Sequence, residues 1–402
     1  MRQTYYKDLL KLGLPIMIGQ LGIIVLSFAD TMMVGRCGTA ELAAASFVNN
    51  MFNLVIVFST GFSYGLTPVV GNHYGRGECS SVGRMLKNGL AVNAVAALGL
   101  MMLMSVLYFN IHRLGQPAEL LPLMRPYYIV LLISLLPVLL FNAFKQFADG
   151  ITDTVTPMFV LLGGNVLNIF LNWVLIYGKL GAPAMGLLGA GVATLTARVA
   201  MLLCFALVFF KAKRYRPYVQ GFHESRINRQ DFVLLNKMGM PVGLQMGMET
   251  ASFSLASLLM GWLGATELAA FQVMCITGSL CFLVYYGIGA AASIRISHHY
   301  GRGEWENIRI TATAAFHIIM LVAAILSIAI ALSQNHLAML FTTDKSIQTM
   351  FAALLIPMLA YQVSDGIQIN YANALRGIEV TKPLGLPVAE SSMFEVSACI
   401  PK

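Results

Sequence analysis

Long apolar runs separated by short polar segments dominate the pattern along this chain. Four of these runs, residues 88–112, 154–178, 268–294 and 310–343, contain no Asp, Glu, Lys or Arg. Each is long enough for the roughly 20 apolar residues that cross the hydrocarbon core of a bilayer. The alternating pattern of a porin-like barrel is absent, and backbone groups in lipid must be satisfied internally. The sequence therefore predicts an all-α polytopic membrane protein.

The apolar runs and their charged or Gly/Pro borders predict ten membrane-spanning helices. A basic segment at 211–229 separates the sixth helix from the seventh. The predicted spans lie near residues 9–35, 43–72, 86–110, 122–146, 157–178, 186–211, 232–262, 267–296, 308–332 and 346–375.

An internal repeat organises these helices. The hexapeptide His-Tyr-Gly-Arg-Gly-Glu occurs at 73–78 and again at 299–304, an offset of 226 residues. The same offset superposes Lys-Leu-Gly-Leu-Pro at 11–15 on Lys-Met-Gly-Met-Pro at 237–241. We interpret the chain as two homologous, parallel halves related by an axis along the membrane normal, with the hexapeptides as matching cytoplasmic hinges.

The repeat predicts an N-terminal six-helix lobe at 1–215, a cytoplasmic linker at 216–230 and a C-terminal lobe of four helices at 231–383. Two further helices would be expected from about Pro383 onward. The segment 384–402 carries Glu390, Glu395 and several serines, so we expect a non-membrane tail. This pattern predicts a second lobe that is truncated, and weak or no ion-driven export from this chain.

Composition and charge agree with a membrane location. The chain is 57% apolar and 11% charged, with a mean hydropathy of +0.73, whereas soluble domains carry roughly 25% charged residues. With a cytoplasmic N-terminus, nineteen basic residues fall on the inner side and five on the outer side. We therefore expect a multi-pass protein of the cell inner membrane. The net charge of +8 needs no nucleic-acid partner.

Three acidic residues interrupt otherwise apolar helices: Asp30, Glu249 and Asp365. An isolated charge in the membrane is costly, so such residues usually face a cavity or a partner. No basic residue in these three spans can pair with them, and none of the acids is repeated at the 226-residue offset. They are therefore candidates for binding an external cation, a proton or a cationic solute. The alternative is that each is protonated or hydrogen-bonded to a neighbouring helix.

A second polar set lies in the fifth predicted helix, where Asn165, Asn168 and Asn172 share one helix face. Hydrogen bonding between helices explains them equally well. Tyr361, one turn before Asp365, and Gln272 are further candidates for lining the same cavity.

Arg198 and the six cysteines are weaker candidates for function. The arginine can pair with a neighbouring helix or extend toward the membrane surface. The cysteines show no metal-ligand or redox spacing, and small packing residues are the better interpretation.

The sequence does not contain the motifs that are typical of other function classes. No phosphate-binding loop is present, and neither a metal-binding His/Glu pattern nor a nucleophile with a base lies inside the membrane. We therefore expect a transporter rather than an enzyme, acting as a monomer and without a cofactor other than its coupling ion. A lipid-linked oligosaccharide flippase is the nearest alternative. Such a flippase would need basic groups in its cavity to bind diphosphate head groups, whereas the charged residues inside the membrane here are chiefly acidic. A channel is a further alternative that is compatible with the sequence.

Several motifs together resemble the multidrug and toxic compound extrusion (MATE) family, and within it the NorM-like branch. The resemblance covers roughly residues 11–383. The residues that carry it are Pro15, the Asp-Thr-Met-Met-Val-Gly run at 30–35, 71–77, 149–154, 168–182, Glu249, the Tyr-Gln-Val-Ser-Asp run at 361–365, and Leu-Arg-Gly at 375–377.

This resemblance implies an antiporter that expels organic cation drugs or toxic metabolites in exchange for Na⁺ or H⁺, alternating between outward-open and inward-open states. It implies a cation-coupling site made by Glu249 and Asp365, with Tyr361 nearby, and Na⁺ as the favoured ion. Asp30, Asn168 and Asn172 would form the acidic, polar centre of the N-terminal lobe. Asp30 is a candidate for both coupling and solute binding.

Overall fold

The structure, a computed structural model, describes residues 2–113, 115, 117–341 and 345–381. These residues are almost entirely helical, and no strand occurs among them. The α-helices are α1 (Arg2–Gly35), α2 (Thr39–Tyr64), α3 (Leu66–Gly75), α4 (Cys79–Phe109), α5 (Leu121–Gly150), α6 (Val155–Tyr177), α7 (Gly186–Lys211), α8 (Arg216–Glu224), α9 (Arg229–Leu263), α10 (Ala265–Arg302), α11 (Trp305–Phe341) and α12 (Lys345–Gly377). Short 3₁₀ turns lie at Ile111–Arg113, Ala118–Leu120 and Lys213–Tyr215.

The predicted all-α polytopic fold is confirmed, and every predicted span coincides with a helix. The span predicted at 43–72 divides at Gly65 into α2 and α3. Eight segments of the described chain are long and apolar enough to cross a membrane: α1, α2 with α3, α4, α5, α6, α7, α10 and α11. The helices α9 and α12 are also long, and each carries a proline and an acidic residue in its interior. The predicted tail at 384–402 lies outside the described residues.

Contacts divide the chain into two compact units. Unit 1 comprises Met1–Met17 and Met248–Lys402, and unit 2 comprises Ile18–Gly247. Both α1 and α9 therefore contribute their first part to one unit and the remainder to the other. The lobe boundaries predicted at 215 and 231 stay predictions.

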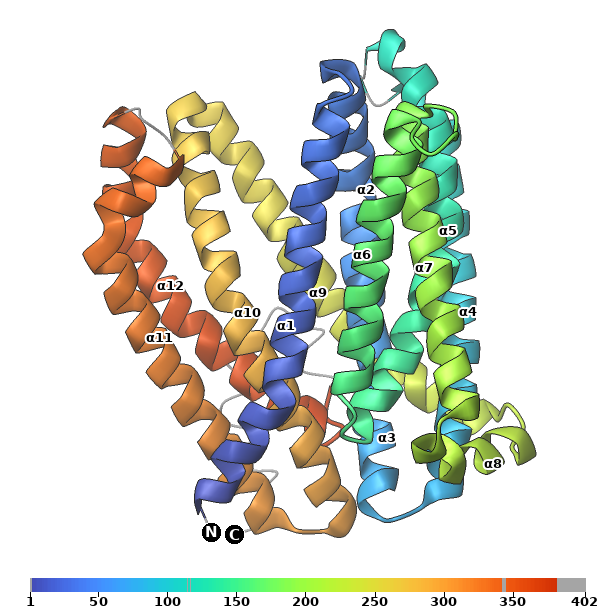
Figure 1. Cartoon of the computed structure of the whole chain (residues 1–402). Helices are drawn as coiled ribbons and strands as arrows, with labels where there is room; N and C mark the ends of the chain where they lie inside the picture. The colour runs from blue at the N-terminus through green and yellow to red at the C-terminus, as the bar shows by residue number, and fades with distance from the viewer. Residues whose placement is uncertain (1, 114, 116, 342–344, 382–402) are drawn as a thin grey trace. The chain divides into compact units, whose positions relative to one another are not determined.

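Unit 2 is built around two buried clusters. In Figure 1, α4, α5, α6 and α7 run side by side, and α5 and α6 each pack closely on α7. Phe144 and Phe147 of α5 pack against Phe205 and Phe209 of α7, with ring centroids 5.6 Å apart for Phe144–Phe205 and for Phe147–Phe209. These rings bury a large apolar area at the end of the unit that carries α8. A second cluster joins α2, α4 and α5 around Tyr128.

A buried charged cluster closes the turn between α5 and α6. Asp153 accepts hydrogen bonds from Tyr215 (2.6 Å) and the backbone N–H of Thr156 (3.2 Å), and pairs with Arg214 at 2.9 Å. Asp153 thus satisfies an N–H group in the first turn of α6 and fixes where that helix begins.

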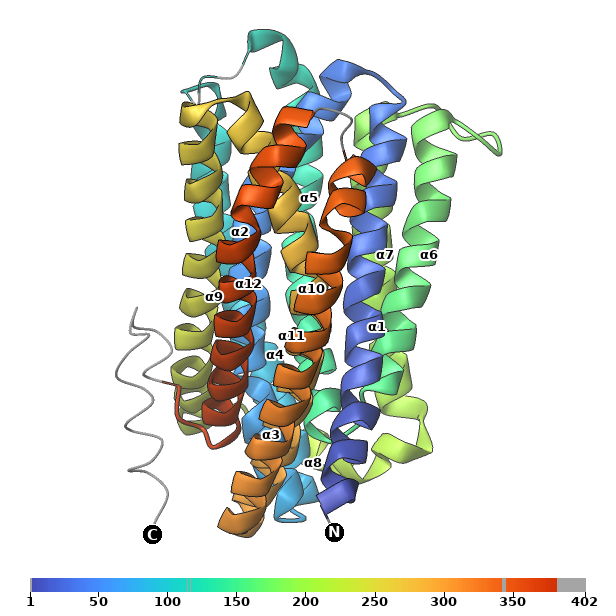
Figure 2. The same cartoon turned by 90° about the vertical axis from the view of Figure 1, so that its left-hand side faces the viewer.

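Unit 1 contains α10, α11 and α12, with α10 in close contact with both others (Figure 2). Several polar contacts hold the first part of α1 in this unit, among them one between the Tyr6 hydroxyl and His317 Nδ1 of α11 at 3.0 Å. Asp8 pairs with Arg295 of α10 at 2.6 Å, and the Tyr5 hydroxyl donates to Asn307 Oδ1 of α11 at 2.7 Å. The N-terminal turns of α1 are therefore anchored to two helices far away in the sequence.

The internal repeat of the sequence is also a repeat of packing. In unit 1, a Cβ added at Gly13 of α1 would lie 3.0 Å from the carbonyl oxygen of Gly287 of α10. In unit 2, a Cβ added at Gly61 of α2 would lie 2.9 Å from the carbonyl oxygen of Val242 of α9, and one added at Gly239 of α9 would meet the carbonyl oxygen of Phe62 of α2. The 226-residue offset maps Gly13 onto Gly239 and Gly61 onto Gly287. Each unit thus contains a close helix crossing at equivalent glycines of the repeat.

The two hexapeptides form matching turns. His73 Nδ1 lies 2.6 Å from Glu78 Oε2, and His299 Nδ1 lies 2.6 Å from Glu304 Oε2. The glycine before each glutamate has a left-handed backbone, with φ of 77° and 70°. The hydrogen bond from His73 lowers the pKa of Glu78, while hydrogen bonds from Asn307 and then His299 lower the pKa of Glu304. Both turns are closed by the same polar contact.

Candidate functional site

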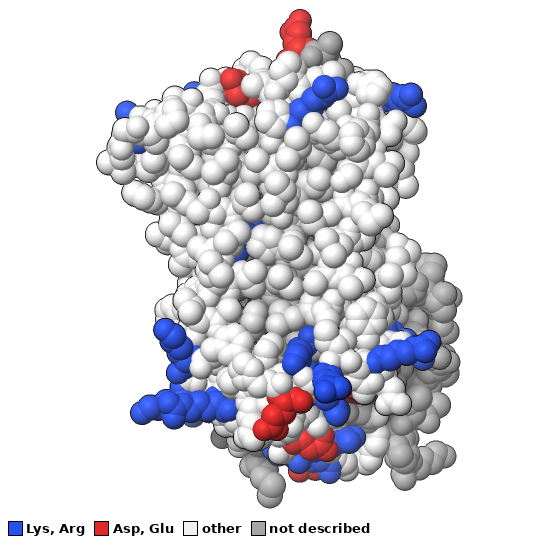
Figure 3. Space-filling model, turned by 90° about the vertical axis from the view of Figure 1, so that its right-hand side faces the viewer, with Lys and Arg blue, Asp and Glu red and all other residues white. Residues whose placement is uncertain are grey.

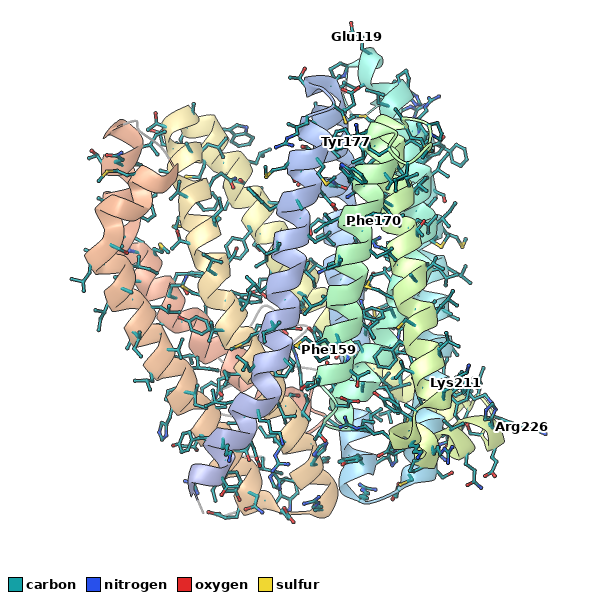
Figure 4. All side chains as sticks on the ribbon, in the orientation of Figure 1. Glu119, Phe159, Phe170, Tyr177, Lys211 and Arg226 are labelled. Carbon is teal, nitrogen blue, oxygen red and sulfur yellow. The ribbon has the colours of Figure 1, made fainter. Side chains whose placement is uncertain are left out.

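The helix α6 separates an apolar face from a polar one. Phe159 and Phe170 are 65% and 48% exposed, as expected for side chains that face lipid, and Figure 4 shows them spaced along this helix. Asn165, Asn168 and Asn172 are buried on the other side. The three asparagines therefore turn into unit 2, as their spacing predicts.

Asn172 lies at the centre of a hydrogen-bonded chain. Its Nδ2 donates to Oδ1 of Asp30 on α1 at 2.6 Å and to Oδ1 of Asn168 at 2.9 Å. Asn168 Nδ2 in turn donates to the hydroxyl of Thr194 on α7 at 3.2 Å. The structure therefore brings Asp30, Asn168 and Asn172 together. Asn172 Oδ1 is buried and accepts no hydrogen bond from the described residues.

Arg198 adds a positive charge to this region. It lies one helical turn after Thr194 on α7, and its Nη1 donates to the Ser134 hydroxyl of α5 at 2.6 Å. Its guanidinium interacts electrostatically with Asp30 and with Tyr127, whose hydroxyl donates to Asn49 Oδ1 at 2.9 Å. We call Asp30, Asn168, Asn172, Thr194 and Arg198 the unit 2 polar cluster.

The span that contains Asp30 has no basic residue, but Arg198 of another helix, α7, interacts with Asp30 electrostatically. The hydrogen bond from Asn172 of α6 corresponds to the alternative in which Asp30 bonds to a neighbouring helix. The pairing of Arg198 with a neighbouring helix is confirmed by its bond to Ser134. Sequence reasoning did not identify Thr194 and Ser134. The spacing of four between Thr194 and Arg198 was a usable signal, because it places both on one face of α7.

A second acidic site lies in unit 1. Asp365 of α12 is 3% exposed, and no hydrogen bond or ion pair of the described residues involves its carboxylate. It interacts electrostatically with Glu249 of α9. Tyr361, one turn earlier on α12, interacts with both acids and makes an edge-on contact with Phe253 at 6.0 Å between ring centroids. The structure thus brings Glu249, Tyr361 and Asp365 together in one unit.

Further buried polar atoms lie on α12, which carries Asp365, and on α10, which packs against it. Gln362, on the same helix, is 1% exposed, and neither its Oε1 nor its Nε2 has a partner among the described residues. The buried hydroxyl of Tyr285 on α10 is likewise unpartnered. Each of these oxygens is a hard ligand of the kind that alkali cations take.

The remaining predicted residues lie elsewhere. Gln272 of α10 is exposed, and its side chain donates a hydrogen bond to the Ser257 hydroxyl at 2.7 Å. It belongs to unit 1, whereas Asp30, Asn168 and Asn172 belong to unit 2. Asp30 is likewise in the other unit from Glu249 and Asp365. In the described part of the chain, no group of three or more His, Cys, Asp or Glu side chains is placed to hold a metal ion.

The MatE family model matches residues 15–174 and 241–386, and these two segments begin 226 residues apart, at the offset of the internal repeat. The chain belongs to the MatE family. It is 30% identical over 372 residues to the multidrug resistance protein NorM of Vibrio vulnificus strain YJ016, covering 92% of this chain and 81% of the relative. It is 28% identical over 389 residues to the multidrug resistance protein MdtK of Edwardsiella ictaluri, covering 95% of this chain and 84% of the relative.

Solved structures share the MATE fold. The Vibrio cholerae MATE transporter VcmN superposes with a TM-score of 0.84 at 17% identity, covering 95% of this chain and 86% of that one. The eukaryotic MATE transporter AtDTX14 gives a TM-score of 0.82 at 17% identity, covering 94% and 84%. The predicted family is therefore confirmed. This chain is a membrane transporter rather than an enzyme.

Proposed function

We propose that this MATE-family protein is a secondary active multidrug exporter, which exchanges organic cations for Na⁺ or H⁺ by alternating access. The names of its relatives NorM and MdtK support the multidrug part of the proposal. The two acidic sites support cation exchange, because carboxylates bind either an inorganic cation or a proton. Exchange results when occupancy by the coupling ion and occupancy by the solute disfavour each other.

The observation that carries the proposal is the state of Asp365. A buried carboxylate without a hydrogen bond is unfavourable unless it binds a cation or a proton. Glu249 adds a second negative charge, and Gln362 Oε1 and the Tyr285 hydroxyl offer neutral oxygens. We assign this site to the coupling ion. The resemblance to the NorM-like branch favours Na⁺.

The unit 2 polar cluster is assigned to the solute. Asp30 supplies a negative charge, and Asn172 Oδ1 supplies an acceptor beside it, so a protonated amine can bind both. Asp30 is partly exposed, whereas Asn168 and Asn172 are 2% and 0% exposed. The Asp30 carboxylate is therefore accessible to a solute, and the side-chain amides of Asn168 and Asn172 hold it in position.

The proposal includes an inner-membrane location with a cytoplasmic N-terminus. Figure 4 shows Glu119 at one end of unit 2, and Lys211 and Arg226 at the other end. Figure 3 shows basic side chains gathered beyond one end of a largely uncharged belt. Basic residues concentrate on the cytoplasmic side of membrane proteins, so the end with Lys211 is assigned to the cytoplasm. A single copy of the chain is sufficient for the proposed exchange, because each acidic site is formed by residues of one unit of that chain.

Ethidium export from proteoliposomes tests the function. The wild-type protein is compared with Asp30→Asn, Glu249→Gln and Asp365→Asn under separate Na⁺ and H⁺ gradients. Whichever gradient drives export, Glu249→Gln and Asp365→Asn should abolish the response to it. Unchanged export in all three variants contradicts the site assignment. Uptake of labelled ethidium is also measured with and without unlabelled ethidium on the opposite side of the membrane. Faster uptake in its presence indicates a carrier rather than a channel.

A further inference from the structure

The basic segment 211–229, which includes α8, carries a dense group of exposed cationic side chains. Arg214 pairs with the buried Asp153 at 2.9 Å, and no salt bridge of the described residues involves the other basic residues of the segment. The exposed basic residues are Lys211, Lys213, Arg214, Arg216, Arg226 and Arg229.

The acidic residues at this end of unit 2 do not offset the positive charge. Asp153 is already paired with Arg214. Asp231, at the start of α9, is buried and pairs with Arg84 of α4 at 3.1 Å. Within the segment itself, Glu224 is the only acidic residue. The surface around α8 therefore has a clear excess of positive charge.

The backbone of α8 packs directly against the backbone of α4. A Cβ added at Gly83 of α4 would collide with the carbonyl oxygen of Tyr218 of α8. One added at Gly221 of α8 would collide with the carbonyl oxygen of Ser80 of α4. Such a close crossing fixes the position of α8 on unit 2.

Polar contacts to α4 also fix the residues that follow α8. Lys87 Nζ donates a hydrogen bond to the Ser225 carbonyl oxygen at 2.6 Å and lies over the Phe222 ring, 5.6 Å from its centroid. Asn88 Oδ1 accepts a hydrogen bond from the backbone N–H of Asn228 at 2.9 Å. The basic side chains on both sides of α8 are therefore attached to a backbone of defined position.

An exposed apolar stripe on α7 leads to this basic segment. Leu203, Leu207 and Phe210 are all exposed, and their spacings of four and three place them on one face of α7. Lys211 follows directly, and Ile227 adds a further exposed apolar side chain among the basic ones. Figure 3 looks onto the side that carries α8 and shows basic side chains below a largely uncharged belt. Apolar and cationic groups thus meet at the border of the belt.

We propose that α8 and its flanking residues bind an anionic phospholipid, with Lys213, Arg216 and Arg226 on its headgroup phosphate and the apolar stripe of α7 against its acyl chains. Lysine and arginine near the membrane surface attract anionic headgroups, and their contributions add up. A positive charge excess alone orients a protein in the membrane, whereas a cluster held in place beside an apolar stripe also selects a headgroup. The site is separate from the proposed exchange, since it uses neither acidic site.

Competition between two lipids tests the proposal. The purified full chain in detergent is mixed with equal amounts of phosphatidylglycerol and phosphatidylcholine that have identical acyl chains, and native mass spectrometry counts the retained molecules of each. We expect the wild-type protein to retain phosphatidylglycerol preferentially. The triple variant Lys213→Gln, Arg216→Gln, Arg226→Gln should lower the ratio of the two lipids at least about tenfold. A higher concentration of ammonium acetate should also lower this ratio, because salt screens exposed charges.

A second triple variant provides the matched control. Arg113→Gln, Arg125→Gln, Lys179→Gln removes three exposed basic residues of unit 2 outside the segment 211–229 and should keep the wild-type ratio. None of the six replaced side chains forms a salt bridge with the described residues, so both variants should fold. No preference in the wild-type protein, or an equal loss in both triple variants, overturns the inference. Displacement of phosphatidylglycerol by millimolar inorganic phosphate also overturns it, because the surface would then bind phosphate without acyl chains.

Discussion

Asn172 donates a hydrogen bond from Nδ2 to Oδ1 of Asp30 over 2.6 Å, joining α6 to the part of α1 that belongs to unit 2. The two residues are 142 positions apart in the sequence. Because Asn172 also donates to Asn168, it connects the acid to the buried face of α6. The position of the Asp30 carboxylate therefore depends on one amide group.

Replacement of Asn172 by alanine should weaken binding of a cationic dye about tenfold or more. The variant removes a hydrogen bond to a charged group, which contributes roughly 1.5–3 kcal/mol, and it removes the acceptor beside Asp30. Fluorescence anisotropy with the purified protein measures the effect. Asn165→Ala is the matched control, since Asn165 is buried on the same face and its Nδ2 has no partner among the described residues. Similar losses in both variants would mean that the effect is one of packing.

Asp365→Asn should remove a Na⁺-dependent gain in thermal stability. An ion that binds only the folded protein stabilises it by about 2.7 kcal/mol at a concentration 100 times its dissociation constant. The midpoint of thermal unfolding is measured in NaCl and in choline chloride at equal ionic strength. We expect a higher midpoint in NaCl for the wild-type protein and for Asp30→Asn, but equal midpoints for Asp365→Asn. If Asp30→Asn has equal midpoints in the two salts and Asp365→Asn keeps the higher midpoint in NaCl, the ion site lies in unit 2.

The close helix crossings should be intolerant of a single methyl group. Gly61→Ala places a Cβ 2.9 Å from the Val242 carbonyl oxygen and 3.0 Å from the Gly243 Cα, both of which are backbone atoms. Such overpacking costs roughly 1–3 kcal/mol. Gly163→Ala, in the interior of α6, has no atom within 4 Å and should be neutral or stabilising by up to about 1 kcal/mol. Thermal unfolding of both variants in detergent checks the difference. Equal stability of the two variants argues against a tight crossing.

The hexapeptide turns should lose stability as the pH falls. The pKa values of Glu78 and Glu304 are lowered in the folded protein, so the ionised forms stabilise it above the pKa of the unfolded chain. This contribution is lost as the pH falls through the folded values, and the exposure of both carboxylates keeps it small. The double variant Glu78→Gln, Glu304→Gln should therefore flatten the acid side of the curve of unfolding temperature against pH. An identical curve for the variant and the wild-type protein contradicts this role.

The sequence predicted the helices well because their signal is local. Charge-free runs of membrane length allow only helices, and the 226-residue offset located equivalent positions in the two halves. The polar cluster was predicted only in part. Asn168 and Asn172 were found because their spacing defines a face. The electrostatic interaction of Asp30 with Arg198 depends on which face of α7 packs against α5 and α6, and a single helix carries no signal for that. The division of α1 and α9 between two units is likewise a tertiary property, with no local signature in either helix.

Two natural cysteines report the orientation of the chain in the membrane. Cys79 is exposed at the start of α4, just after the first hexapeptide, and Cys37 lies in the turn between α1 and α2. These positions lie near opposite ends of α2 and α3. A cytoplasmic N-terminus places Cys79 inside the cell and Cys37 outside it.

A membrane-impermeant maleimide applied to intact cells should therefore label Cys37 and spare Cys79. Two variants, each retaining one of these cysteines, have the other five replaced by serine. Burial and the nearby Glu41 raise the pKa of the Cys37 thiol, so it holds less thiolate at neutral pH and should react slowly. Labelling at a mildly alkaline pH corrects for this. Disrupted cells provide the control, because both cysteines should then react. Labelling of Cys79 in intact cells, with Cys37 reacting only after disruption, reverses the assigned orientation and places the end with Lys211 outside.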